Sequence, residues 1–170
     1  AHIEEQFSSM FLAGGIMLSQ VASITGLEPH TVQNWVKRGF LSPPQNKRYT
    51  LRQLCRILNI NMLKSALPLE EICGLLQYIN GDLDDESDDL IDDSQLYFMF
   101  VELAARAKEL YDRDSADVLL EQSLAEYIEP RPGAKQRVKE ALRIMLTAYL
   151  AERMRQEAEK MLNNVKENLL

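Results

Sequence analysis

Polar and basic side chains recur between residues 30 and 49 in an order suited to contacting duplex DNA. Glutamine and asparagine amides, as at Gln33 and Asn34, can form two hydrogen bonds with adenine in the major groove. Lysine and arginine neutralise phosphates, and hydroxyl groups also hydrogen-bond to them. The candidate DNA-binding residues are His30, Thr31, Gln33, Asn34, Lys37, Arg38, Lys47, Arg48 and Tyr49.

These residues divide by the contact expected of each. Gln33 and Asn34 are expected to read bases, and His30 either touches a phosphate or is an exposed first-turn residue without a role. The residues expected to hold phosphates are Thr31, Lys37 and Arg38. The residues expected to engage the adjoining groove or backbone are Lys47, Arg48 and Tyr49.

A helix-turn-helix pattern in residues 18–38 positions the first part of this set. Ala22 is small enough for two crossing helices to touch, and Gly26 follows where the chain must turn sharply. Helices are therefore expected over residues 19–25 and 29–38. The side chains expected to face inward are Val21, Leu27, Val32 and Trp35. Small helical hairpins in enzymes share much of this pattern, so it is only moderately specific for DNA binding. An enzyme is nevertheless a distant third alternative, because no nucleophile–base pair, phosphate loop or carboxylate pair stands out.

The second part of the set follows in a short extended segment. Residues 39–50 carry two bases and an aromatic near their tip, which predicts a two-stranded hairpin around residues 42–49 that acts as a wing. Thr50 and Gln53 then form a capping box, which predicts a helix over residues 51–64. A further helix is expected over residues 68–79.

Residues 18–79 resemble the winged helix-turn-helix domain of the MerR regulators. The residues that carry the resemblance are Ala22, Gly26, Thr31, the stretch Arg38-Gly39-Phe40-Leu41-Ser42-Pro43, and Lys47-Arg48-Tyr49. The resemblance implies double-stranded DNA as the partner. Gln33-Asn34 replaces the usual Arg-Tyr of that family and the wing is shorter, so the base preference does not carry over. The whole chain is also similar to an uncharacterised bacterial family, a domain of unknown function, which implies no activity.

Charge is distributed unevenly along the 170 residues, of which 46% are apolar and 26% charged. The net charge of -7 should repel nucleic acid from the molecule as a whole. Residues 1–81, however, carry 7 bases against 5 acids, whereas residues 82–170 carry 12 against 21. Between residues 28 and 56, 6 bases face a single acid, so a basic surface is expected on an acidic protein.

The acidic stretch over residues 82–93 is expected to separate two domains. It holds 8 acids and no base, and its self-repulsion predicts an extended linker or loop. The expected domains are a MerR-like winged helix-turn-helix over residues 1–81 and a helical dimerisation or sensing domain over residues 94–170. The acidic stretch is either a solvated spacer or a DNA mimic that shields the basic surface.

The second half predicts helices over residues 94–112, 116–128 and 134–169. An apolar stripe with alternating steps of four and three, typical of coiled coils, follows the last of them: Val138, Leu142, Met145 and Tyr149, and then, after a skip, Met154, Ala158, Met161 and Val165. It fits either a helix of an internal bundle or a dimer seam. One group of aromatic residues fits either an effector pocket or a bundle core: Tyr97, Phe98, Phe100, Tyr111, Tyr127 and Tyr149.

The sequence lacks the residues that metal binding and catalysis require. The chain has two histidines, His2 and His30, and its two cysteines lie 18 positions apart, which is not the spacing of a zinc site. Cys55 and Cys73 are expected as buried neutral thiols. No nucleophile–base pair or phosphate loop stands out, so we expect no catalytic residue, cofactor or metal. The apolar stretch at residues 11–18 is shorter than the roughly 20 residues needed to cross a bilayer, which favours a cytoplasmic protein.

The sequence therefore predicts a mainly α fold: an N-terminal winged helix-turn-helix with a small two-stranded wing, followed by an all-α domain that ends in a long helix. The expected function is a DNA-binding transcriptional regulator that forms a homodimer through its C-terminal helical region. A small-molecule effector is possible but unsupported. The alternative is a protein-interaction module whose winged helix no longer binds DNA.

Overall fold

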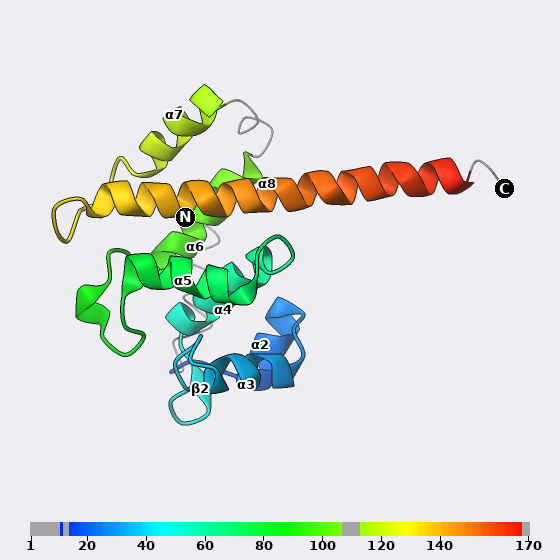
Figure 1. Cartoon of the computed structure of the whole chain (residues 1–170). Coiled ribbons are helices and arrows are strands. Elements are labelled where there is room, and N and C mark those ends of the chain that lie inside the picture. The colour runs from blue at the N-terminus through cyan, green and yellow to red at the C-terminus, as the bar shows by residue number, and fades with distance from the viewer. Residues whose placement is uncertain (1–10, 12–13, 107–112, 168–170) are drawn as a thin grey trace.

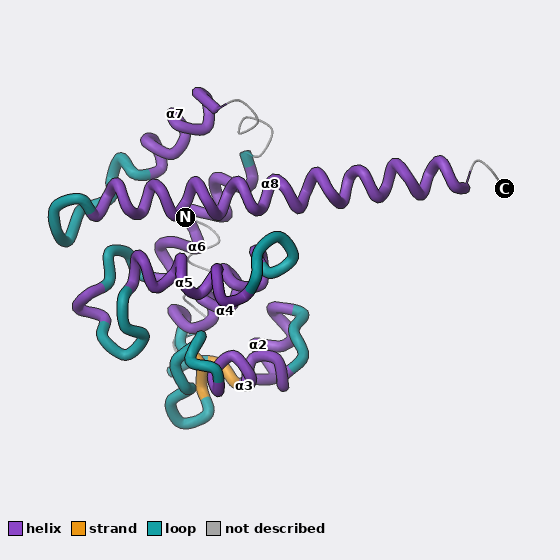
Figure 2. Tube along the Cα trace, in the orientation of Figure 1, coloured by secondary structure: helices purple, strands orange, loops and turns teal. Residues whose placement is uncertain are grey.

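A computed structural model describes residue 11 and residues 14–106 and 113–167, which are mainly helical with one small antiparallel sheet near the N-terminus (Figure 2). The elements are β1 (Ile16–Met17), α2 (Leu18–Thr25), α3 (Pro29–Lys37), β2 (Arg48–Tyr49), α4 (Leu51–Leu63), α5 (Leu69–Asn80), the 3-10 helix η1 (Glu86–Asp88), α6 (Asp93–Ala105), α7 (Arg113–Ser123) and α8 (Ala134–Glu167). In Figure 1, α2, α3 and β2 form one end, α4 to α6 lie in the middle, and α8 crosses the other end with α7 beyond it.

Local signals account for the first helices. Gly26 follows α2 with φ +68° and Gly39 follows α3 with φ +74°, the left-handed conformation in which helices commonly end. At the start of α4, the Gln53 amide donates to Thr50 Oγ1 at 3.2 Å, and the Thr50 amide donates to Gln53 Oε1 at 2.9 Å. This is the expected capping box. The first four helices lie within one residue of their expected bounds.

The later helices depart further from their expected bounds. The helix expected over residues 116–128 is observed as Arg113–Ser123, because turns after Leu124 let Tyr127 enter the core, where its hydroxyl donates to the Leu90 carbonyl. The helix expected over residues 94–112 ends at Ala105, and residues 107–112, including Tyr111, lie outside the described residues. The end expected at residue 169 also lies outside them.

The hairpin expected over residues 42–49 is wrong. Strand β2 pairs instead with β1, which lies before α2, with Ile16 opposite Tyr49 and Met17 opposite Arg48. Within the expected hairpin the structure has a single bridge, between Gln45 and Arg48. Pro43 and Pro44 explain the difference, because proline lacks the N–H that a strand donates to its neighbour.

One cluster of buried apolar side chains runs from Ile16 to Ala148 and joins both halves of the chain. The inward-facing positions expected in the first helices are confirmed, with Val21 and Val32 fully buried and Trp35 3% exposed. α4 contributes to this core along most of its length and packs against α6. The boundaries at residues 81 and 94 stay predictions, and residues 82–92 form a loop that holds η1.

The stripe along α8 divides into a buried half and an exposed half. Val138, Leu142 and Met145 are fully buried within the chain, whereas Met154 and Met161 are 59% and 62% exposed. Figure 1 shows the C-terminal half of α8 projecting beyond the other elements. None of the described helices has the length and apolar character to cross a membrane.

Candidate functional site

Helix α3 has one buried face and, on its outer side, a polar face. Val32 and Trp35 anchor the helix in the core, so its remaining sides are turned outward. The exposed residues of the expected set on this helix are His30, Gln33, Asn34 and Lys37, and Thr31 is half-buried. This arrangement gives one surface with two amides, an imidazole and an ammonium group.

The turn at residues 45–48 brings a second lysine to the surface. Asn46 and Lys47 have φ of +48° and +62°, the left-handed conformation of both central residues in a type I′ turn. Lys47 lies at the tip of this turn and is exposed. Among the described residues, neither Lys37 nor Lys47 has an ion-pair partner. Both charges are therefore available to an external anion.

Arg38 and Arg48 are exposed but anchored. The Arg38 guanidinium forms an ion pair with Glu70 and lies 4.4 Å from the centre of the Phe40 ring. A backbone hydrogen bond and then Arg38 lower the pKa of Glu70. Arg48 donates from Nη1 to the Gly15 carbonyl at 2.8 Å, which ties β2 to the residue before β1. Each arginine thus has a structural partner in addition to any external one.

Tyr49 differs from the other eight expected residues because it is only 3% exposed. Its ring belongs to the core, where it pairs across the sheet with Ile16. Burial raises the pKa of its hydroxyl. The expectation of an exposed aromatic at the tip is corrected here, because the side chain alternation of β2 turns Arg48 outward and Tyr49 inward.

The expected basic surface is smaller than the sequence predicts, because Arg52 and Arg56 of α4 are paired with acids. Arg52 forms ion pairs with Asp89, Glu86 and Asp93, the Glu86 contact being 3.2 Å. Arg56 is 5% exposed and lies 3.2 Å from Asp93, from Nη1 to Oδ2. Neither arginine is free to bind an external anion.

The acidic stretch therefore meets α4 and not the polar face of α3. Burial raises the pKa of Asp89 to about 6, and burial also raises the pKa of Asp93, in both cases against the opposing effect of the arginines. Within the described residues, the acidic stretch forms ion pairs with Arg52 and Arg56, and no contact supports the hypothesis of a DNA mimic over Lys37 and Lys47.

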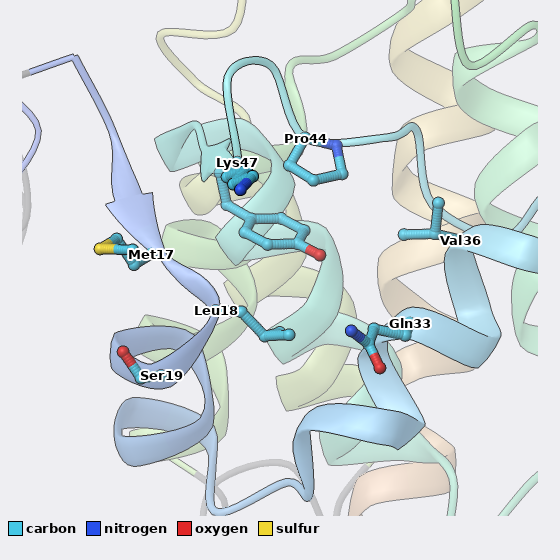
Figure 3. Close-up of a pocket in the computed structure, with 8 residues that line it drawn as sticks. Met17, Leu18, Ser19, Gln33, Val36, Pro44 and Lys47 are labelled. Carbon is cyan, nitrogen blue, oxygen red and sulfur yellow. The ribbon is translucent and has the colours of Figure 1, made fainter.

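An apolar groove of about 560 Å³ lies between α2, α3 and the 45–48 turn (Figure 3). Leu18 and Ser19 come from the start of α2, Gln33 and Val36 from α3, and Lys47 from the turn. The complete lining is Met17, Leu18, Ser19, Gln33, Val36, Pro44, Lys47 and Tyr49. The groove thus joins three of the expected residues, Gln33, Lys47 and Tyr49, to others that sequence reasoning missed.

The missed residues are Met17, Leu18, Ser19, Val36 and Pro44. The first three join the site because β1 pairs with β2, a contact between segments more than thirty residues apart. One local feature of the sequence, the glycine at position 15, could have indicated this strand pairing. Gly15 has φ +103°, and a Cβ there would lie 2.7 Å from the Tyr49 carbonyl oxygen, so the close approach of the two strands requires glycine.

The cysteines are buried as expected. Cys55 is fully buried and Cys73 is 8% exposed. Burial raises the pKa of both thiols, that of Cys73 to about 11, so both are neutral at physiological pH. Within the described ranges, no group of three or more His, Cys, Asp or Glu side chains is placed to hold a metal ion.

The part of the chain that matches a family of known proteins contains this whole site. A family model described as "Domain of unknown function (DUF1836)" matches residues 14–100, slightly more than half of the chain. The chain belongs to the DUF1836 family. The DUF1836 match begins just before β1 and continues through the acidic loop to Phe100, a fully buried residue of α6. It therefore includes the α4–loop ion pairs as well as the α2–α3 surface.

One curated relative of this DUF1836 chain is the "Uncharacterized protein YkrK" of Bacillus subtilis (strain 168). It is 31% identical over 80 residues, which cover 45% of this chain. The matched region spans only 34% of that relative's own length. No solved structure matches the chain.

Proposed function

We propose that this DUF1836 chain is a transcriptional regulator that binds double-stranded DNA with a MerR-like winged helix-turn-helix. In this proposal α3 is the recognition helix, α2 crosses behind it, and the 45–48 turn is a short wing. The observation that carries the proposal is the surface of α3, where His30, Gln33, Asn34 and Lys37 are exposed while Val32 and Trp35 hold the helix to the core.

The chemistry of this surface supports base reading more than simple charge attraction. Gln33 and Asn34 can each pair with adenine through two hydrogen bonds. In this proposal Lys37 of α3 and Lys47 of the turn, both of which are exposed, neutralise phosphates of the DNA backbone. Arg38 and Arg48 add charge at the same end of the molecule, although each keeps its internal partner.

A homodimer formed through the C-terminal half of α8 completes the proposal. Ala151, Met154, Ala158, Met161 and Val165 follow steps of three and four, and all five are exposed in the single chain. A second copy would cover this stripe. Dimerisation also suits DNA reading, since one recognition helix contacts few base pairs and a two-fold partner supplies a second half-site.

A protein-interaction module is the second candidate, and two observations favour it. Arg52 and Arg56, which the sequence offered as part of a basic surface, are paired with acids of the same chain. The net charge of -7 also opposes non-specific attraction to DNA. In that case the stripe on α8 would bind a different protein, and DNA binding would be absent.

The test is selection of a randomised duplex library on the full chain at near-physiological salt, followed by affinity measurements over a salt series. The proposal expects an enriched motif and an affinity that falls steeply with salt. Lys37→Ala and Lys47→Ala should each flatten the logarithmic salt slope by about one unit. Gln33→Ala should change the preferred sequence.

The matched control is Lys64→Ala at the C-cap of α4, because Lys64 is likewise exposed and belongs neither to α3 nor to the 45–48 turn. It should leave the salt slope unchanged. No enriched motif at either low or physiological salt would overturn the proposal and favour the interaction module. Equal loss of affinity on every sequence with Gln33→Ala would contradict its role in base reading.

A further inference from the structure

The apolar groove lies where a recognition helix and its wing would meet DNA, yet its surface is unlike the polar face of α3. Leu18, Val36 and Pro44 supply apolar carbon groups, and Figure 3 shows them on three sides of the same hollow. Gln33 and Lys47 bring one amide and one charge to the same groove. Phosphate contacts and hydrogen bonds to bases leave this apolar surface unexplained.

The charge around the groove favours a polyanion as its occupant. None of the eight lining residues is acidic, although the chain has 26 acids and a net charge of -7. The larger cavity beside α5, of about 680 Å³, is mixed in charge, since Glu70, Asp82 and Asp84 line it together with Arg38 and Arg56. The apolar groove differs from it because its one charged lining residue is Lys47 and no acid lines it.

DNA offers one apolar group at the major-groove edge of its bases, the 5-methyl group of thymine. Gln33, which lines the groove, has the amide that pairs with adenine, the partner of thymine. An apolar wall next to such an amide is thus complementary to both members of an A·T pair.

We propose that the apolar groove takes the 5-methyl group of a thymine, so that the protein distinguishes this base from its unmethylated equivalent. Val36 and Leu18 contact the methyl group, and Lys47 binds a phosphate of the adjacent backbone. Because the groove is larger than one methyl group, the apolar edge of the deoxyribose occupies part of it as well. This inference rests on the DNA binding proposed above and names the group that fills the groove.

The experiment uses the full chain and a duplex that it has enriched from the randomised library. Each thymine of the duplex is replaced in turn by deoxyuridine, which lacks only the methyl group, and affinity is measured by fluorescence anisotropy at fixed salt. We expect one thymine in the half-site whose replacement weakens binding about fourfold, the effect of burying one methyl-sized group. Replacement of the other thymines should change the affinity little.

Val36→Thr assigns that effect to the groove, because it exchanges a methyl for a hydroxyl group at nearly constant size. The fourfold ratio between thymine and deoxyuridine should fall towards one in this variant. Val118→Thr is the matched control: it makes the same exchange on α7, where Val118 is 55% exposed and remote from α3 (Figure 1). It should keep the ratio. Circular dichroism and thermal unfolding establish that both variants are folded.

The outcomes separate this inference from the proposed function. If the protein enriches no duplex, DNA binding and the thymine contact both fail. If it enriches a duplex but no deoxyuridine substitution weakens binding, or Val36→Thr keeps the ratio, only the thymine contact is overturned. Enrichment of a duplex without any effect of the thymine methyl group is also the result expected if the groove binds a protein partner.

Discussion

Lys47 combines an exposed charge with a backbone conformation that favours glycine. Its φ of +62° places Cβ close to a carbonyl oxygen, which costs about 1 kcal/mol for a residue other than glycine. We predict that Lys47→Gly raises the free energy of unfolding by a few tenths to about 1 kcal/mol while weakening DNA binding. Urea unfolding and fluorescence anisotropy measure the two effects.

Lys64 provides the control for this prediction, because its φ is -60° and its charge lies at the far end of α4. Lys64→Gly should lower the free energy of unfolding and leave DNA binding unchanged. If Lys47→Gly instead destabilises the protein as much as Lys64→Gly does, the left-handed conformation of Lys47 holds no strain that glycine relieves, and the prediction is wrong.

Asp89 makes a contribution to stability that depends on pH. Its pKa is about 6 in the folded protein and 3.8 in the unfolded chain, chiefly because burial disfavours the charged carboxylate. Between these values the folded state binds more protons, so this contribution is fully present below pH 4 and is lost as the pH rises through 6. Asp89→Asn removes the ionisable group, while Arg52 keeps Glu86 and Asp93 as partners.

We therefore predict that the stability of Asp89→Asn relative to the wild-type protein increases from pH 4 to pH 7. Urea unfolding at both pH values gives the comparison. A difference between the two proteins that is the same at both pH values would contradict the assigned pKa.

At the scale of elements, the antiparallel pairing of β1 with β2 depends on Gly15. Alanine at this position would meet the Tyr49 carbonyl oxygen at 2.7 Å and would also adopt φ of +103°, so Gly15→Ala should cost about 1–3 kcal/mol of stability. Gly74 is the opposite case. It lies inside α5 with open space around it, and Gly74→Ala should stabilise the protein by about 0.5–1 kcal/mol.

Thermal unfolding of the two variants tests this pair of predictions, and the signs matter more than the magnitudes. A stabilising effect at Gly15 would mean that β1 does not lie against β2. A destabilising effect at Gly74 would mean that a Cβ at this position of α5 meets a neighbour.

The elements that the sequence predicted well are those with local causes. The bounds of α3 follow from Pro29 at its start and Gly39 after its end, and its buried side from the spacing of Val32 and Trp35. The same periodicity places Gln33 and Asn34 outside. These signals lie within one or two helical turns, so one sequence is enough to read them.

The features that the sequence did not predict depend on partners distant in the chain. Arg52 and Arg56 look like surface charges until the acidic loop folds back and places Asp89 and Asp93 against them. Tyr49 looks like an exposed tip residue until β2 pairs with β1 and not with the segment that contains two prolines. Hydrophobic periodicity and composition cannot predict such contacts, because the contacts arise only when the tertiary fold forms.

For the whole molecule, the distribution of charge limits what one copy can do. With Arg52 and Arg56 internally paired, the α3 surface has Lys37, Arg38, Lys47 and Arg48 to attract phosphates, against a net charge of -7. If the proposed function holds, each copy neutralises few phosphates, and the affinity that depends on released counterions is low for a monomer. A dimer doubles these contacts without a change in the surface.

The projecting half of α8 is the surface on which such a dimer depends. We predict that the full chain is a dimer at micromolar concentration and that Met154→Glu combined with Met161→Glu makes it monomeric. Both side chains are about 60% exposed in the single chain, so charge at these positions should disrupt the seam and leave the fold intact. Sedimentation velocity gives the mass, and circular dichroism gives the helix content.

The matched control places the same two charges on the opposite face of α8, with Gln156→Glu and Asn163→Glu at the same seven-residue spacing. It should remain a dimer. The monomeric variant should bind a single half-site as the wild-type protein does but lose affinity for two half-sites on one duplex, because the second recognition helix is no longer tethered. If both double variants keep the wild-type mass, the stripe on α8 is not the dimer seam, and a second copy cannot be what covers it.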